Sequence, residues 1–419
     1  MKVLKFGGSS VADAEQIKKV AKIIQSQSDV KSVIVSAPGK RSDDDIKVTD
    51  QLISYSQTKD EATFELIQNR FLDIIKNLDS QFDILSFLDI IRSDILDGAS
   101  QSYILSRGEY LNALIIADYL GASFVDAKDI IKIGYDNKVD ARSYELTSKA
   151  LKDIDFSVIP GFYGMDMDGK IQTFSRGGSD ISGAIVAKAV GADIYQNWTD
   201  VSGMLQADPR IVAEAKTIKE LTYREVKELA VMGASVFHED AIAPAYEGNI
   251  PINIRNTNQP ADDGTLISIT RDASHSPIAA VSGLKPFLWI IVTKTGSCEQ
   301  IKQKLDAASI RIYKQSISEN AAQLWLSLAE GMEPEEAEAI FEQTVGSNGY
   351  IVKGMVAHIA VVGQDILNHV DIFIDMLNLL QKNNIQIHYA NYGGSTLRAS
   401  VMVDAQDYAK ALQIMAAAI

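Results

Sequence analysis

The sequence has only one cysteine, Cys298, in 419 residues, so no disulfide can form within the chain. It also lacks any run of about 18 apolar residues that could form a membrane helix, and the apolar run at its start is too short for a signal peptide. The basic residues form no cluster, and a net charge of −15 would repel nucleic acids and anionic membranes. We therefore expect a cytoplasmic protein with no nucleic-acid or membrane partner.

Three common catalytic signatures are missing as well. The five histidines show neither HExxH nor Cys/His spacing, which argues against a zinc site. The segment Gly39-Lys40-Arg41-Ser42 is no Walker A loop, because arginine stands where the motif needs Ser or Thr and the upstream glycine is absent. No G-x-G-x-x-G follows a predicted strand. These absences disfavour zinc enzymes, P-loop enzymes and dinucleotide-binding enzymes.

The order of predicted strands and helices in the first 270 residues indicates an α/β fold. Helices are predicted at Ala14–Ile24, Glu109–Leu120 and Ser179–Val190. Strands are predicted at Val3–Phe6, Ser32–Ser36, Ser123–Asp126, Phe156–Ile159, Ile171–Phe174 and Asp193–Asn197. The alternation predicts a mainly parallel sheet with helices on both faces, and ligands bind such sheets beyond the carboxyl ends of the strands.

The pattern changes after Ser282 to two similar sets of short elements. The first set has strands at Phe287–Thr293, Ile310–Tyr313 and Leu324–Leu328 and a helix at Glu299–Leu305. The second has strands at His358–Val362, Ile385–Tyr389 and Leu397–Val403 and a helix at Val370–Leu380. This internal repeat predicts two small βαββαβ units. We place the domains at 1–280, 281–350 and 351–419, and the chain can interleave between the last two.

The first glycine-rich turn, Lys5-Phe6-Gly7-Gly8-Ser9-Ser10, suits a phosphate. Gly7 and Gly8 let backbone N–H groups come close to the ligand, Lys5 adds a mobile positive charge, and the following helix adds its positive end. A simple turn is the alternative that these residues leave open.

The second glycine-rich turn, Phe174-Ser175-Arg176-Gly177-Gly178-Ser179-Asp180, suits a second anion. Arg176 can bind a carboxylate through two parallel hydrogen bonds, and Asp180 can hold an ammonium group or orient lysine and Mg²⁺. A helix capped by Ser179 or Asp180 is the alternative. If the two turns face each other across a cleft, they hold a phosphate donor against another anion, and we expect phosphate transfer.

Five motifs in this order resemble aspartate kinases, which belong to the amino-acid kinase family. They are Lys5–Ser10, Ser106-Arg107-Gly108-Glu109, Phe174–Asp180, Trp198-Thr199-Asp200-Val201-Ser202-Gly203 and Ala207-Asp208-Pro209-Arg210. The resemblance spans the chain and implies an αβα sandwich followed by two ferredoxin-like ACT domains. It implies ATP- and Mg²⁺-dependent phosphorylation of the L-aspartate side-chain carboxylate to 4-phospho-L-aspartate, the first step of lysine, threonine and methionine biosynthesis.

The resemblance also implies roles for individual residues, although it names no Mg²⁺ ligand. Catalytic residues would be Lys5 and Asp180; ATP-binding residues Lys5, Gly7, Gly8, Ser9, Ser36, Thr199, Asp200 and Arg210; aspartate-binding residues Thr49, Glu109, Arg176, Gly177, Gly178 and Ser179. Taken alone, Thr49 could be a helix cap, and Glu109 an exposed carboxylate at the start of a helix.

Some positions depart from the family. Leu205 stands where relatives often have tyrosine, and Ser235 where many have lysine; both positions contact nucleotide in relatives. In the second ACT unit, Asn391 and Ser395 would contact an amino-acid effector, lysine or threonine. The usual Ser-Glu-x-Asn pattern is absent there, so a purely structural, dimer-forming role is an equal alternative.

Two other functions fit the same residues. One is an amino-acid kinase that acts on glutamate, acetylglutamate or a nucleotide monophosphate. The other is a catalytically degenerate amino-acid sensor, which only Leu205 and Ser235 favour. For the aspartate kinase that the resemblance implies, we expect a homodimer or larger homo-oligomer formed through the ACT domains.

Overall fold

The computed structural model describes residues 1–419 except 176, 235–238, 275, 295–297 and 394–396. The chain divides into two compact units. The first comprises Met1–Met204, Thr217–Lys227 and Ser235–Arg271, and the second comprises Leu205–Lys216, Glu228–Ala234 and Asp272–Ile419. None of the described helices combines the length and apolar character needed to cross a bilayer.

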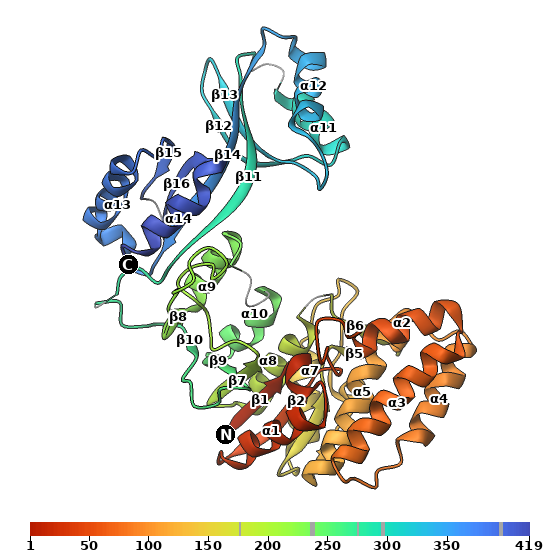
Figure 1. Cartoon of the computed structure of the whole chain (residues 1–419). Helices are drawn as coiled ribbons and strands as arrows, with labels where there is room; N and C mark the ends of the chain where they lie inside the picture. Colours follow the sequence, from red (N-terminus) through yellow and green to blue (C-terminus); the bar gives the residue numbers. More distant parts are fainter. Residues whose placement is uncertain (176, 235–238, 275, 295–297, 394–396) are drawn as a thin grey trace. The chain divides into compact units, whose positions relative to one another are not determined.

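A sheet of eight strands forms the centre of the first unit (Figure 1). In spatial order the strands are β3 (Ser123–Phe124), β4 (Ser157–Pro160), β2 (Val30–Val35), β1 (Lys2–Phe6), β7 (Ile194–Thr199), β9 (Ile252–Asn256), β10 (Thr265–Ser268) and β8 (Glu220–Thr222). Neighbours run parallel except for the antiparallel pair β9–β10. The predicted α/β fold with a mainly parallel sheet is confirmed.

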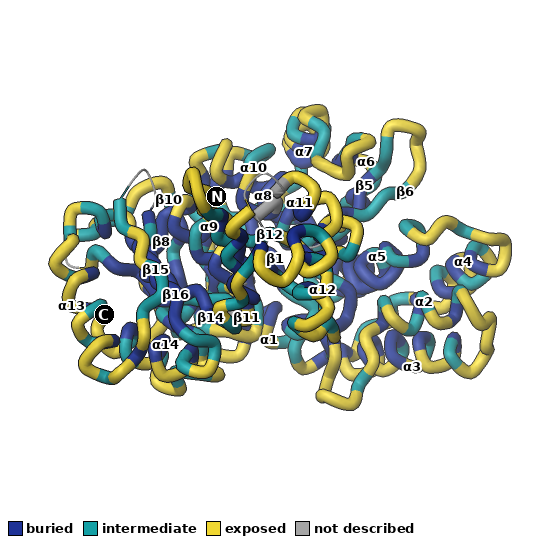
Figure 2. The backbone as a smooth tube through the Cα atoms, turned by 90° about the horizontal axis from the view of Figure 1, so that it is seen from above, coloured by how far each residue is buried: buried dark blue, intermediate teal, exposed yellow. Residues whose placement is uncertain are grey.

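Helices lie on both faces of this sheet. The helices of this unit are α1 (Ala14–Gln25), α2 (Val48–Thr58), α3 (Glu61–Asn77), α4 (Ile84–Leu96), α5 (Gln101–Leu120), α6 (Ala127–Ile130), α7 (Arg142–Leu151), α8 (Gly178–Val190) and α10 (Glu239–Glu247), whereas α9 (Tyr223–Val231) begins in the first unit and ends in the second. Helices α1 to α5 share one hydrophobic core with the sheet, and α5 is buried along much of its length (Figure 2). Helix α8 packs against β1 and also against its neighbouring helices α7 and α10.

The alternation of side chains along β1 directs Lys5 toward α8. Leu4 and Phe6 belong to the core formed with α1 to α5. Successive residues of a strand face opposite sides of the sheet, so Val3 and Lys5 face the other layer. The ammonium of a buried lysine therefore lies under the first turn of α8.

Two sequence predictions in this unit were wrong. Segment Ile171–Phe174 is no strand of the main sheet, because β6 (Ile171–Thr173) pairs only with β5 (Tyr163–Met165) in a two-stranded antiparallel ribbon. The helix predicted from Glu109 begins at Gln101, after Ser100, whose hydroxyl accepts a hydrogen bond from the N–H of Tyr103. Gly108 obscured this helix, yet it serves close packing: a Cβ there would lie 2.7 Å from the Cβ of Ala37.

The second unit is built on one six-stranded sheet in the order β12-β13-β11-β14-β16-β15, in which all neighbouring strands are antiparallel. Its elements are β11 (Ala280–Val292), α11 (Cys298–Ala307), β12 (Arg311–Ile317), β13 (Ala322–Ser327), α12 (Pro334–Val345), β14 (Tyr350–Val362), α13 (Val370–Lys382), β15 (Ile387–Asn391), β16 (Arg398–Asp404) and α14 (Tyr408–Ala416). One hydrophobic core lies under α11 and α12 and another under α13 and α14, and the long strands β11 and β14 contribute to both. The repeated pattern is present, whereas the domain limits near 280 and 350 stay predictions.

A capping box at the start of α9 also holds the segment that follows β10. Glu225 Oε2 accepts hydrogen bonds from the N–H and hydroxyl of Thr222, and the Thr222 hydroxyl accepts one from the N–H of Glu225. The same carboxylate pairs with the Arg271 guanidinium at 2.6 Å, and both side chains are almost fully buried. Removing the carboxylate therefore leaves a buried positive charge.

We predict that Glu225→Ala lowers the free energy of unfolding by about 3–5 kcal/mol, because Arg271 loses its buried counter-ion. Urea denaturation followed by circular dichroism measures this loss. The control is Glu145→Ala, which removes an exposed glutamate in the first turn of α7. Equal effects of the two substitutions would contradict the structural role given to Glu225.

Candidate active site

Lys5 forms a buried ion pair with Asp180. The distance from Lys5 Nζ to Asp180 Oδ1 is 2.5 Å, and the two side chains are 9% and 18% exposed. Asn197 stands beside Lys5 in the parallel β1–β7 register, accepts a hydrogen bond from its Nζ at 3.4 Å and donates one to Asp180 Oδ1 at 2.9 Å. Side chains from β1, β7 and α8 thus fix the position of the ammonium group.

The N-terminus of α8 has no side-chain cap. Its N-cap residue is Gly177, whose φ of +62° lies in the left-handed region that favours glycine. Ser179 and Asp180 lie in the first helical turn, so the alternative in which one of them caps the helix was wrong. Uncapped N–H groups at a helix start favour anions, and Arg176, the predicted carboxylate ligand next to this turn, lies outside the described residues.

The turn after β1 touches the loop after β2. Gly39 N donates a hydrogen bond to Gly8 O at 2.9 Å, and a Cβ on Gly39 would lie 2.6 Å from the carbonyl carbon of Gly8. Two glycines are therefore needed where the backbones meet. Helix α1 begins only at Ala14, and Asp13 caps it by accepting a hydrogen bond from Gln16 N. The expected contribution of its positive end to this turn is thus not supported.

A cleft of about 660 Å³ lies where these loops meet α5. Its lining includes six of the residues predicted from the sequence: Gly8, Ser9, Ser36, Thr49, Glu109 and Asp200. Three positively charged side chains on the loop after β2 also line it, namely Lys40, Arg41 and Lys47. The sequence does not predict this role for their positive charges, because the segment matches no known phosphate-binding loop. Lys5 is not one of the lining residues; its Nζ lies 3.5 Å from the position of a Cβ on Gly7, the residue before Gly8 of the lining.

Glu109 is a buried carboxyl group within α5. Burial raises its pKa to about 8, while the N–H of Ala37 and the charge of Arg107 act in the opposite direction. Its Oε2 has no hydrogen-bond partner among the described residues. The interpretation as an exposed carboxylate at a helix start is therefore wrong. Thr49 is the second residue of α2, whose N-cap is Lys47, so Thr49 is no cap either.

The remaining predicted residues lie as follows. The hydroxyl of Thr199 donates to Asp200 Oδ1 at 3.1 Å at the end of β7. Arg210 belongs to the second unit and forms an ion pair with Asp208 at 2.7 Å. In the same unit, exposed Asn391 donates to the hydroxyl of Tyr389.

Three more positions were singled out in the sequence. Leu205 belongs to the second unit and is half-buried. Ser235 and Ser395 lie outside the described residues. All assigned roles, including those of Arg210 and Asn391, stay predictions.

Two amide side chains at the site were not predicted. Asn197 lies on β7 between Gln196 and Trp198, and fully buried Asn112 on α5 donates to Ser36 O at 2.8 Å, which ties the loop after β2 to α5. The signal for Asn197 was present, since Gln196-Asn197 places two amides inside a strand that is otherwise apolar. Asn112 gave no such signal in a helix of mixed composition.

The described residues contain no group of three His, Cys, Asp or Glu side chains that could hold a metal ion. Asp180 is engaged with Lys5, and the exposed carboxylates that line the cleft among the described residues are Asp43 and Asp200. The side chains described here therefore provide charge for an anionic ligand rather than a metal cage.

The α/β unit, the glycine turn with Lys5 and the cleft with its positive charges are typical of phosphotransferases. The model of the amino acid kinase family matches residues 1–256, so the chain belongs to that family. An ACT domain model matches residues 359–419.

Within the family, the chain is similar to aspartokinases. It is 31% identical to aspartokinase 3 of Bacillus subtilis (strain 168), with 99% of this chain and 98% of that protein covered. The crystal structure of Clostridium acetobutylicum aspartate kinase is 37% identical, with a TM-score of 0.91 and complete coverage of both chains. Escherichia coli aspartokinase III in complex with lysine and aspartate has the same fold, at 22% identity, a TM-score of 0.77 and coverage of 100% of this chain and 99% of that one.

We predict that Gly39→Ala destabilises the protein by about 1–3 kcal/mol, because its Cβ overlaps backbone atoms of Gly8 and Ser9 that cannot move independently. The matched control is Gly7→Ala: φ at Gly7 is −70°, and the nearest atoms to its new Cβ lie at 3.5 and 3.7 Å. Thermal unfolding of both variants measures the difference. The close approach of the two loops would be refuted if both variants unfolded at the wild-type temperature.

Proposed function

We propose that the chain is an aspartate kinase, which transfers the γ-phosphoryl group of ATP to the side-chain carboxylate of L-aspartate. The observation that carries the proposal is the buried Lys5–Asp180–Asn197 network beside a glycine-lined cleft with a cationic wall. The similarity to aspartokinases over essentially the whole chain supports the choice of aspartate. E. coli aspartokinase III, solved with aspartate and ADP, supports a nucleotide as the second substrate.

The reaction requires positive charge more than it requires a base. The carboxylate of aspartate has a pKa near 3.9 and is ionised at neutral pH, so it needs no proton acceptor. Its oxygen forms a bond to the γ-phosphorus, the bond from that phosphorus to the bridging oxygen breaks, and ADP leaves with the electron pair. Two unit charges 4 Å apart interact by about 4 kcal/mol at an effective dielectric constant of 20, and Lys5 is positioned to offset such repulsion.

The cleft supports a division into a phosphate side and an amino-acid side. Gly8, Ser9 and Ser36 offer small residues, hydroxyls and backbone N–H groups beside the positive charges of the loop after β2. The uncapped start of α8 suits the α-carboxylate of aspartate. Glu109 is the carboxylate available to its ammonium group, and Thr49 lies near it in the same cleft.

Mg²⁺ would be held mainly by phosphate oxygens and water, since the described residues provide no cluster of carboxylates. A bound Mg²⁺ would supply further positive charge to the triphosphate. The chain's own contribution is the orientation of Lys5 and of the two loops.

The ACT region supports regulation by an amino acid. E. coli aspartokinase III, solved with lysine, is the precedent, and lysine or threonine is the proposed effector here. A homodimer formed through this region, with Asn391 and Ser395 at the effector site, belongs to the same proposal.

We predict that Lys5→Met lowers kcat for aspartate-dependent ADP release by about 10²–10³-fold, because the ammonium that stabilises the transferring group is lost. A coupled ADP assay measures this, with Lys18→Met as control because half-buried Lys18 lies on α1 and forms an ion pair with Glu15 of its own helix.

The same assay with glutamate, acetylglutamate and nucleotide monophosphates separates the alternatives. ADP release with one of these compounds and not with aspartate would show that this compound is the substrate. No ADP release with aspartate or with any of these compounds would favour a degenerate sensor. Activity of Lys5→Met equal to that of wild type would remove Lys5 from the catalytic role.

We predict that aspartate binding releases close to one proton per site at pH 7. The pKa of Glu109 in the free protein is about 8, so the carboxyl group is mostly neutral at pH 7. An ammonium group nearby favours the ionised form and expels the proton. Affinity for aspartate should therefore rise from pH 6 to 8 and level off above pH 8.

Calorimetry in buffers of different ionisation enthalpy counts the released protons. Glu109→Gln should bind aspartate more weakly and without proton release. An unchanged proton count in that variant would show that another group titrates.

A further inference from the structure

Buried Arg70 on α3 joins the two segments that follow β1 and β2. Its Nη2 donates hydrogen bonds to the carbonyl oxygens of Ala12 at 2.9 Å and Gly39 at 2.7 Å, and its Nη1 pairs with Asp45 Oδ2 at 2.7 Å. Only 4% of the side chain is exposed. One guanidinium therefore binds the chain after the glycine turn and the cationic loop at the same time.

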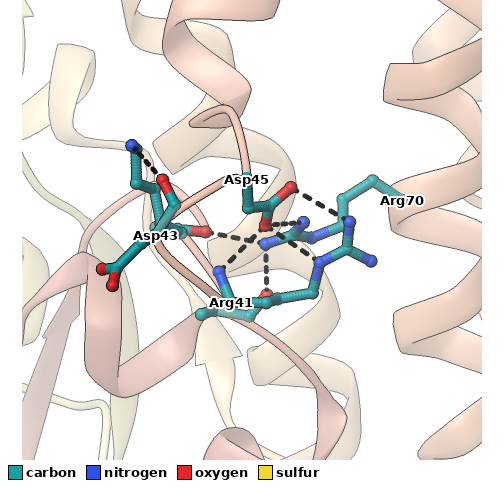
Figure 3. Close-up of polar contacts among 7 residues, drawn as sticks. Arg41, Asp43, Asp45 and Arg70 are labelled. Carbon is teal, nitrogen blue, oxygen red and sulfur yellow. Dashed lines mark hydrogen bonds and ion pairs between the residues drawn. The ribbon is translucent and has the colours of Figure 1, made fainter.

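Asp45 closes the loop from its other end. It receives two hydrogen bonds from the Arg41 guanidinium, Nε to Oδ2 at 2.9 Å and Nη2 to Oδ1 at 3.1 Å, and a third from Arg41 N at 2.9 Å (Figure 3). Hydrogen bonds from Arg41, and then from Arg70, hold the pKa of Asp45 well below its ordinary value. The carboxylate therefore stays ionised between two guanidinium groups throughout the neutral range.

The loop held in this way forms a wall of the cleft. Gly39, Lys40, Arg41 and Asp43 line it, and Lys40 Nζ donates to the carbonyl of Asp43 at 3.0 Å. Arg70 does not line the cleft, because it reaches the loop from α3 behind it. The position of the cationic wall relative to the glycine turn is thus set by a residue that need not contact any ligand.

We propose that Arg70 is a positioning residue for phosphoryl transfer, acting through Asp45 and the carbonyl of Gly39. This inference rests on the proposed kinase function. Catalysis by positioning depends on placement to within fractions of an ångström, whereas the contacts that bind each substrate tolerate larger movements. Loosening the loop should therefore lower kcat more than it raises either KM.

The test uses Arg70→Lys and Asp45→Asn in the full-length protein. Lysine keeps the charge but loses the planar fork that binds three acceptors, and asparagine removes the charge that holds both arginines. Arg92→Gln is the matched control, because Arg92 on α4 pairs with Glu61 of the same helix α3 but at the exposed surface. If Arg70→Lys does not fold, Asp45→Asn decides the outcome.

We expect kcat to fall by about 30-fold in both variants, with changes below about threefold in the KM values for ATP and aspartate and no change in the control. Hydrogen exchange measured by mass spectrometry should be at least about tenfold faster in peptides that contain the N–H groups of Gly39, Arg41 and Asp45. A kcat within about threefold of wild type in the folded variants, or unchanged exchange in this loop, would overturn the proposal.

The exchange measurement separates this proposal from the assignment of function. If the wild-type protein has no aspartate kinase activity, the proposed function is refuted, while hydrogen exchange in the variants still tests whether Arg70 and Asp45 hold the loop. If the variants exchange faster but keep full activity, these contacts are structural only and the positioning role is refuted.

Discussion

The ion pair between Lys5 and Asp180 is the constraint on which the site depends. A buried ammonium group is costly unless it is paired and hydrogen-bonded, and here a carboxylate and an amide provide both. The pairing requires that β1 and β7 lie in register and that α8 begins at Gly178, so that Asp180 falls in its first turn. The left-handed conformation of Gly177 sets that beginning. A change in any of these elements would move the charge on which phosphoryl transfer relies.

The cleft combines positive charge and close backbone contact in one loop. The loop after β2 supplies Lys40, Arg41 and Lys47 to the wall, and its Gly39 touches Gly8 of the turn after β1. Asn112 holds one end of this segment from α5, and Arg70 holds the rest from α3 through the Gly39 carbonyl and the loop's own Asp45. Exposed cations alone would be mobile and well hydrated. Their attachment to two buried helices gives them fixed positions before a ligand arrives.

Local patterns in the sequence were sufficient for the parallel sheet and the repeat in the second unit, because short apolar runs followed by glycines mark strand ends. They left the partner of Asp180 open, and only the family resemblance connected it with Lys5. The ribbon β5–β6 could not be separated from the main sheet, since a short apolar run has the same appearance in both. The burial of Glu109, and with it the raised pKa, arises from the packing of α5 under the loop after β2. Asn112 and Arg70 act over long sequence separations that no local pattern reveals.

The role of Lys5 is tested most directly by a crystal structure of the chain with ADP, aspartate and aluminium fluoride, which mimics the phosphoryl group in transfer. We expect the fluoride to lie between ADP and the side-chain carboxylate of aspartate, within about 3 Å of Lys5 Nζ. Asp180 and Asn197 should keep their contacts with that ammonium group. An aluminium fluoride bound out of reach of Lys5, with Lys5 still paired to Asp180, would show that Lys5 does not stabilise the transferring group.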